Sequence, residues 1–174
     1  METIECIKGR RSRRKFLSKE VSAVIIKRLL ECAASAPSSV DCQPWHFIIV
    51  RNNEKKKKLA DLKDKDNQQH ILTAPISIIV CVDTEKSPSR WIEDGVTATE
   101  NILLAAHDLG LSSVYVTGFK LSEPKVAESI REIFNIPKNI MPITVLPIGY
   151  PDPSEKLDKK QVLDINKVLH EDSW

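Results

Sequence analysis

Residues 87–110 read SPSRWIEDGVTATENILLAAHDLG and form the longest stretch with the pattern of a single helix. The pair Ser87-Pro88 is typical of a helix start, because a capping side chain precedes a proline whose missing N–H needs no partner in the first turn. We predict that this helix runs to Leu109 and stops at Gly110. Its centre, residues 102–106, is wholly apolar. We therefore expect it to lie in the middle of the fold or in a dimer interface.

Shorter elements are predicted on both sides of this helix. Apolar spacing, caps and β-branched runs predict helices over 4–9, 22–35, 53–65 and 122–134, and strands over 46–50, 75–82, 112–117 and 140–148. Pro142 and Pro147 interrupt the last strand, so we expect it at an edge or poorly hydrogen-bonded position. Helices and strands mix without strict alternation, which indicates an α+β fold.

Composition narrows the class of protein. The 174 residues carry 26 Lys and Arg against 24 Asp and Glu, and the length predicts one domain over residues 1–174. No charge-free stretch reaches the roughly 18–20 residues of a spanning helix, and residues 1–16 lack the apolar core of a secretory signal. The four cysteines form no Cys-x-x-Cys pair, so we expect reduced thiols in the cytoplasm and no zinc site.

Glycine spacing excludes two kinds of nucleotide site. The five glycines lie at least eight positions apart. A Rossmann fingerprint and a P-loop both pack their glycines within about six or seven positions, because backbone must approach phosphate closely. A nucleotide-like cofactor in this chain would have its phosphate held by side-chain cations.

The segment from 8 to 19 supplies such cations. Arg10, Arg11, Arg13 and Arg14 lie close together, and guanidinium groups bind phosphate through paired hydrogen bonds. A solvated basic turn is one alternative reading. A nucleic-acid patch is another, although only Phe16 interleaves with the arginines and the rest of the chain balances their charge.

The loop over residues 36–45, APSSVDCQPW, offers several polar side chains between two prolines. Stiff polar loops of this kind suit a ligand, but the same residues are typical of a helix-to-strand connection, which is the simpler reading of the loop alone. Other candidates are weaker: Cys42 with His46 as a nucleophile pair, and adjacent Glu93 and Asp94, which face different directions on a helix. His107 fits an ordinary residue near a helix C-terminus.

Taken together, these segments resemble the FMN-dependent nitroreductase family. The motifs that carry the resemblance are RRSRRKF at 10–16, APSS at 36–39, QPW at 43–45, NILLAA at 101–106, LGL at 109–111, TGF at 117–119 and IGYP at 148–151. They occur in the family's order and span nearly the whole chain.

The resemblance implies a nitroreductase-like α+β fold with a central mixed or antiparallel sheet flanked by helices. It also implies a homodimer with two FMN molecules in its interface and the long helix at its centre. The implied activity is hydride transfer from NADH or NADPH to FMN, and onward to a nitroaromatic or quinone by a ping-pong mechanism. Relatives of this fold also carry out dehalogenation or flavin cleavage, which remains the alternative. Neither a nucleic acid nor a membrane is an expected partner.

The resemblance also implies the cofactor site. Arg10 and Ser12 correspond to phosphate ligands, Arg14 to the residue near flavin N1 and O2, and the loop from Pro37 to a segment laid on the flavin by the partner subunit. The full set of expected cofactor-binding residues is Arg10, Arg11, Ser12, Arg14, Pro37, Ser38, Ser39, Asp41, Asn67, Thr117, Gly118, Lys159 and Lys160. No side chain is expected to be catalytic, because the flavin carries the hydride chemistry.

One position departs from the family pattern. Most members have Asn where this chain has Asp41. A carboxylate accepts but cannot donate hydrogen bonds, and its negative charge disfavours an anionic reduced flavin nearby. We therefore expect Asp41 to affect the flavin potential.

Overall fold

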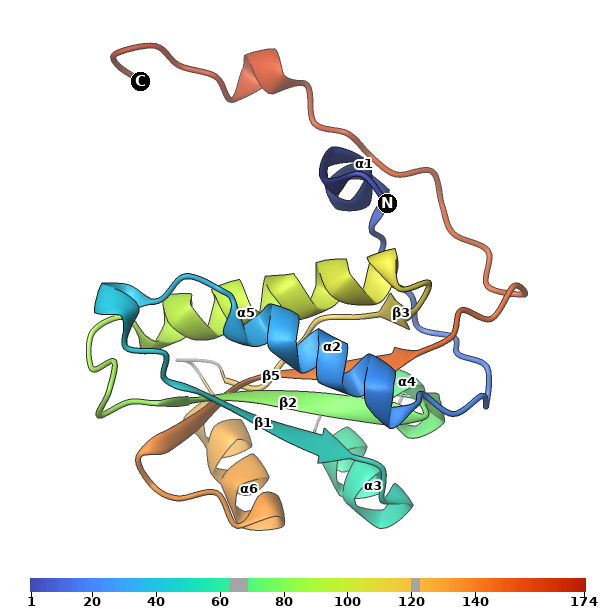
Figure 1. Cartoon of the computed structure of the whole chain (residues 1–174), viewed down its shortest axis with the longest axis vertical. Coiled ribbons are helices and arrows are strands. Elements are labelled where there is room, and N and C mark those ends of the chain that lie inside the picture. Colours follow the sequence, from blue (N-terminus) through green and yellow to red (C-terminus); the bar gives the residue numbers. More distant parts are fainter. Residues whose placement is uncertain (63–68, 120–122) are drawn as a thin grey trace.

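The sheet is built around two long strands that pair with each other. The computed structural model describes residues 1–62, 69–119 and 123–174 (Figure 1). Strand β2 (Ile76–Asp83) lies between β1 (Trp45–Val50) and β5 (Ile140–Gly149), and all pairings between named strands are antiparallel. The two-residue strands β3 (Ser112–Ser113) and β4 (Val116–Thr117) both pair with the far side of β5. The sheet order is therefore β1-β2-β5-β3, with β4 beside β3 on β5.

The expected edge position of the proline-containing strand is wrong. β5 has neighbours on both sides, and nearly all of it is buried. Its prolines are tolerated because β4 pairs only with residues 144–145 and β3 only with 148–149, so neither Pro142 nor Pro147 faces a partner there. Pro142 also lies at a shift of register between β2 and β5. Apolar burial thus outweighs the ladder bonds that the prolines cannot donate.

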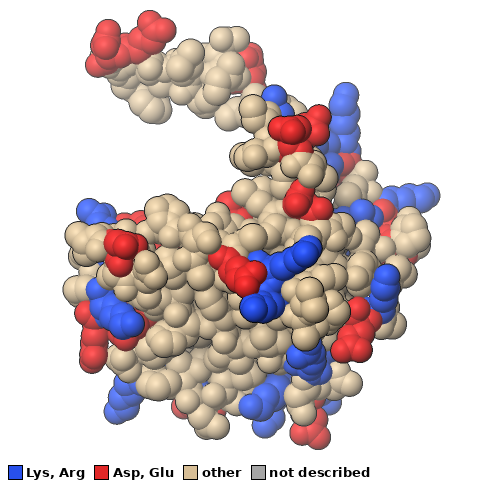
Figure 2. All heavy atoms as spheres, in the orientation of Figure 1, with Lys and Arg blue, Asp and Glu red and all other residues tan. Residues whose placement is uncertain are grey.

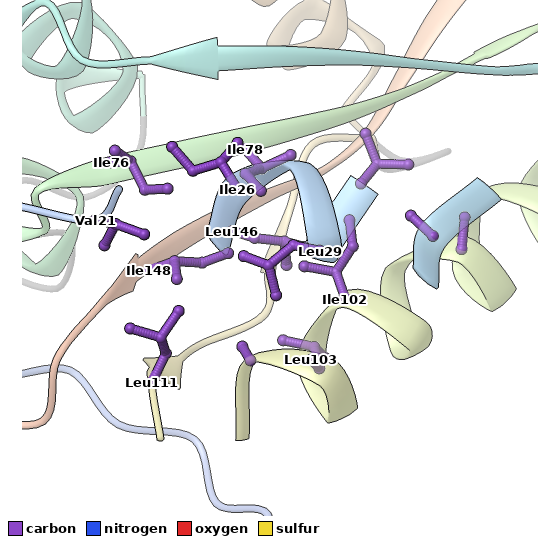
Figure 3. Close-up of a cluster of buried hydrophobic side chains, with 14 of the residues drawn as sticks. Val21, Ile26, Leu29, Ile76, Ile78, Ile102, Leu103, Leu111, Leu146 and Ile148 are labelled. Carbon is purple, nitrogen blue, oxygen red and sulfur yellow. The ribbon is translucent and has the colours of Figure 1, made fainter. Parts of the chain in front are cut away.

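Helices cover both faces of the sheet (Figure 1). Helices α2 (Ala23–Ala34) and α5 (Trp91–Asp108) pack on one face, and α3 (Asn53–Asp61), α4 (Gln69–Thr73) and α6 (Pro124–Phe134) contribute to the core on the other. Side chains of β2 alternate between the two cores: Ile76, Ile78 and Val80 face α2 and α5, whereas Ile79 and Cys81 face α3 and α6. Figure 3 shows the first of these cores.

The long helix begins later than the sequence predicts. α5 starts at Trp91 rather than at Ser87, and it ends before Gly110, whose φ of 73° lies in the left-handed region. Ser87 is buried, and its hydroxyl donates to Asp94 Oδ2 at 2.6 Å instead of capping a helix at its own position. The apolar centre of α5 faces the sheet of its own chain, since Ile102 and Leu103 are almost fully buried.

Other boundaries differ in smaller ways. Ser22 caps α2 as expected, accepting a hydrogen bond from the N–H of Ile25. α3 ends at Asp61, four residues short of the prediction, and the five-residue helix α4 was not predicted. Residues 112–117 form two short strands rather than one. Ser122, expected to cap α6, lies outside the described residues.

Both ends of the chain lie on the side of α5 that faces away from the sheet (Figure 1). Helix α1 (Thr3–Gly9) packs against α5, and residues 152–174, the C-terminal tail, run past α1 and away from the body (Figure 1). A short 3-10 turn, Ile165–Lys167, is the only regular element of this tail. No helix in the described part of the chain is long and apolar enough to cross a membrane.

Candidate functional site

The basic segment, residues 10–14, leaves α1 as an extended strand-like stretch beside β3. Ser12 forms a parallel bridge with Ser113, and the N–H of Arg13 donates to the carbonyl of Ser113 at 3.0 Å. A further tie is the buried Phe16, which bridges to Pro151 just after β5. These contacts fix the backbone of the basic segment against the sheet edge.

The tail folds back over the basic segment and adds a second set of cations. Lys160 Nζ donates to the carbonyls of Lys8 and Arg10, and Arg11 Nη2 donates to the carbonyl of Asp158 at 2.8 Å. The expected ligands Arg10 and Lys160, 150 positions apart, are therefore neighbours. Lys159 is exposed next to them.

Arg13 of the basic segment forms an ion pair with a residue of the tail. Arg13 Nε donates to Glu155 Oε2 at 3.1 Å, and the N–H of Arg14 donates to Glu155 Oε1 at 2.7 Å. Glu155 thus neutralises Arg13 and leaves the guanidinium of Arg14 exposed. These pairs give the arginines structural partners, and Figure 2 shows charges of both signs interspersed on the face it draws. Neither observation favours the nucleic-acid reading.

Positive charge gathers where α1 meets the C-terminal half of α5. Arg10 Nε lies 3.8 Å from Glu100 Oε1, and a Cβ on Gly9 would lie 2.9 Å from His107 Nε2. Burial, together with the positive charges of Arg10 and Lys160, lowers the pKa of His107. Arg10 and Lys160 are hydrogen-bond donors with positive charge, and a phosphate dianion would supply the negative charge and the acceptors that complement them.

His70 is a candidate site residue that the sequence did not reveal. It lies in α4, is only 5% exposed, and its Nε2 has no hydrogen-bond partner among the described residues. Burial, and then the positive charge of Arg14, lowers its pKa to about 4. Buried nitrogens without a partner are rare, so a polar group such as a water or a ligand atom would complete the bonding of His70. No periodic pattern marks His70, because only the packing of α4 buries it.

The loop over residues 36–44 lies against the N-terminal part of α5. Thr97 Oγ1 donates to the carbonyl of Pro37 at 3.1 Å, and the N–H of Gln43 donates to Ser38 Oγ at 3.0 Å. Asp41 is exposed and accepts from the side-chain amide of Gln43 at 3.0 Å. Among the described residues, no ion pair involves Asp41, and no hydrogen bond or ion pair joins this loop to the basic segment.

The remaining expected residues occupy the far strand region. Thr117 pairs with Thr144, and the N–H of Gly118 donates to the carbonyl of Ile143 at 2.8 Å. A Cβ on Gly118 would lie 3.1 Å from that carbonyl, so glycine permits the close approach. Asn67 lies outside the described residues. Within one chain, Arg10, Arg11, Ser12 and Lys160 therefore lie in one region, where the tail contacts the basic segment. The 36–44 loop forms a second, separate group of expected site residues.

The arrangement is that of an α+β protein with side-chain cations gathered at the edge of an antiparallel sheet, where they have the charge and donors to bind a phosphate group. The chain belongs to the nitroreductase family, whose model matches residues 7–70 and 62–150. A protein of Methanothermobacter thermautotrophicus, provisionally named NADH dehydrogenase/NAD(P)H nitroreductase, is 41% identical over 176 residues, covering 100% of this chain and 88% of the relative.

Solved structures agree with this assignment. The FMN-dependent nitroreductase of Clostridium difficile R20291 superposes with a TM-score of 0.86 at 32% identity, over 98% of this chain and 99% of the other. The NADPH:FMN oxidoreductase of Vibrio harveyi, solved in complex with NAD+, gives a TM-score of 0.83 at 25% identity, over 99% of this chain and 77% of the other. The expected fold class is thereby confirmed.

The residues present fit FMN. Arg10, Lys160 and Ser12 have donors suited to a phosphate, while Arg14 and His70 Nε2, which has no hydrogen-bond partner among the described residues, have polar atoms suited to a ring edge. The set contains cations and neutral donors; among the described residues, Glu100 lies 3.8 Å from Arg10 Nε and Glu155 accepts from the N–H of Arg14.

Proposed function

We propose that this protein is an FMN-dependent oxidoreductase formed by one domain, residues 1–174. It takes hydride from NADH or NADPH and passes the reducing equivalents to a nitroaromatic, a quinone or a similar acceptor, with the two substrates using one site in turn. Bound FMN supplies the redox chemistry. The observation that carries the proposal is the hydrogen bond from Lys160 Nζ to the backbone carbonyl of Arg10, which brings a second cation to the basic segment in a chain of the nitroreductase family.

The side chains of this site bind, orient and hold charge. Arg10 and Lys160 would neutralise the phosphate of FMN, and Arg11, Ser12 and Lys159, which are adjacent to them in sequence, would supply further hydrogen-bond donors. Arg14 brings a positive charge to the ring end, where it favours negative charge on a bound group. His70, neutral at physiological pH, offers one donor or one acceptor there.

We infer that the 36–44 loop, with Pro37, Ser38, Ser39 and Asp41, acts on the cofactor of a second subunit. The loop is not joined to the basic segment of its own chain, and its tip is open: Val40 is 94% exposed. Thr117 and Gly118 would face the ring through their backbone. The family's arrangement of the cofactor in a dimer interface accounts for both features.

Exposed apolar surface on the subunit supports a homodimer. The apolar centre of α5 does not supply the exposed surface, because it packs inside its own chain. Exposed apolar side chains lie instead on α1, at Ile4 and Ile7, and along the outer tail, at Val162, Leu163, Ile165, Leu169 and Trp174. A shallow groove of about 600 Å³ between α1, α2 and α5 adds Leu104 and Leu109 to this surface. A lone subunit would expose all of it to water.

Two further assignments follow. Cys6, Cys32, Cys42 and Cys81 are free thiols, which supports a cytoplasmic enzyme. The alternative reaction, dehalogenation or flavin cleavage, is not favoured, because the relatives described above bear the names of nitroreductases and flavin oxidoreductases.

The function is tested by reconstituting the purified protein with FMN and measuring flavin reduction by NADH and NADPH under anaerobic conditions. Steady-state rates with a nitroaromatic and with a quinone then follow, at several fixed concentrations of reductant. We expect a bound flavin spectrum and parallel double-reciprocal lines. A protein that binds FMN but is reduced by neither nucleotide would contradict the proposed activity, and one that binds no FMN would contradict the site.

A further inference from the structure

Asp94 is a buried carboxylate that holds the 36–44 loop from several sides. It lies in the first turn of α5 and is 3% exposed. Its Oδ1 accepts from the N–H of Ser39 at 2.9 Å, and its Oδ2 accepts from the hydroxyl of Ser87 at 2.6 Å and from the thiol of Cys42 at 3.8 Å. Its backbone carbonyl accepts from Trp45 Nε1 at 2.9 Å.

No cation compensates this carboxylate among the described residues. The neighbouring Glu93 is exposed and paired with Arg90 at 3.0 Å, so the two acidic residues have different surroundings. Burying a carboxylate without a counter-ion is costly unless hydrogen bonds satisfy it. Here neutral donors do so, and two of the three come from the loop.

The loop that Asp94 holds is strained. Val40, Asp41 and Gln43 have φ values of 45°, 55° and 44°, in the left-handed region that non-glycine residues avoid. Such a conformation is unfavourable for a non-glycine residue and persists only where the surroundings enforce it. Contacts inside the loop are few, chiefly the bonds from Asp41, Cys42 and Gln43 back to Ser38 and Ser39.

The contacts of Asp94 bracket the strained residues. Ser39 precedes them, Cys42 lies among them, and Trp45 follows them at the start of β1. One buried residue on a rigid helix therefore defines where the strained backbone begins, turns and ends. A simple helix-to-strand connection would need neither the strain nor a buried carboxylate.

We propose that Asp94 is a positioning residue of the flavin site, whose carboxylate sets the loop backbone that presents Pro37, Ser38 and Ser39 to the cofactor. The proposal rests on the proposed function, since it takes the loop to contact FMN. Asp94 itself does not touch the cofactor. Its effect passes through the N–H of Ser39 and the thiol of Cys42.

The test compares Asp94→Asn with Thr99→Val in FMN-loaded protein. Asn keeps the size of the side chain but turns an N–H toward the Ser87 and Cys42 donors. Thr99 is a matched control, because it is buried on the same helix, its hydroxyl bonds to Thr144 at 2.8 Å and to the carbonyl of Gly95, and among the described residues it has no hydrogen bond to the loop. Measured quantities are the FMN dissociation constant, the flavin midpoint potential, hydrogen exchange of residues 38–43 and the urea midpoint.

We expect Asp94→Asn to speed exchange in residues 38–43, to raise the FMN dissociation constant about tenfold and to shift the potential. Thr99→Val should lower the urea midpoint while leaving exchange in the loop, affinity and potential unchanged. Equal affinities and potentials in the two variants would overturn the proposal and leave Asp94 a purely structural residue.

A second variant keeps the test decisive if Asp94→Asn does not fold. Ser87→Ala removes one donor to Oδ2 from outside the loop, and it should change exchange and affinity in the same direction by a smaller factor. Unchanged values in Ser87→Ala would then overturn the proposal. Failure of the proposed function is distinguishable, because it would appear as absent flavin binding in the unaltered protein while the exchange of residues 38–43 still reports on Asp94.

Discussion

Acid should destabilise this protein through His70. The imidazole is 5% exposed, and burial together with the charge of Arg14 lowers its pKa to about 4, against about 6.5 in an unfolded chain. Between pH 6.5 and pH 4, His70 is protonated in the unfolded chain but stays neutral in the folded protein. The free energy of unfolding therefore falls as the pH drops from 6.5 to 4, by about 1.4 kcal/mol per pH unit and about 3 kcal/mol in all.

The perturbation is His70→Gln, which keeps a polar side chain but removes the titration. Urea unfolding is measured at half-unit steps from pH 7.5 to 4.5, at fixed ionic strength and equal FMN content. We expect the variant to lose most of the slope that the unaltered protein shows below pH 6.5. His46→Gln is the matched control, since His46 is exposed on β1, and it should keep that slope. Equal slopes in the His70 variant and the unaltered protein would refute the reasoning.

Further predictions concern the cofactor, the core and the tail. Arg10→Ala should weaken FMN binding by about 2 kcal/mol, or roughly thirtyfold, in a fluorescence titration, whereas the exposed Arg51→Ala should not. Asp41→Asn should raise the flavin midpoint potential in a redox titration by removing a negative charge, and an unchanged potential with unchanged affinity would remove Asp41 from the site. Gly95→Ala should cost about 1–3 kcal/mol in urea unfolding, because its Cβ would lie 2.5 Å from a buried isoleucine of β5. Deleting residues 161–174 should shift the protein from dimer to monomer in sedimentation at micromolar concentration, and a monomeric full chain would contradict the dimer itself.

Local patterns in the sequence were enough for most elements. Ser22 marks the start of α2 because its side chain caps the helix within three residues, and Gly110 marks the end of α5 because it adopts a positive φ. The continuous apolar run of β2 predicts a strand buried on both faces, and both cores contain its side chains. Motifs in family order predicted the fold and the cofactor class.

Features that depend on distant partners were missed or misplaced. The prolines of β5 predict an edge or poorly hydrogen-bonded position, and only the second holds. Prolines are local signals, whereas the short lengths of β3 and β4 that leave Pro142 and Pro147 unpaired on that side are not. The role of Asp94 leaves no local signal in the sequence, because the donors to its carboxylate lie 7, 52 and 55 positions away.

The sequence by itself determined the helices and strands with clear periodicity, the exclusion of a glycine-based phosphate site, and the cations available to replace it. Tertiary structure alone decided that Lys160 bonds to the backbone of Arg10 and that a carboxylate on α5 holds a strained loop. It also decided that His70 Nε2 is buried with no hydrogen-bond partner in the described part of the chain. The physical reason is the range of the interactions. Caps and amphipathic periods act over a few residues, whereas burial, charge and hydrogen-bond satisfaction depend on whichever segments the packed core brings together.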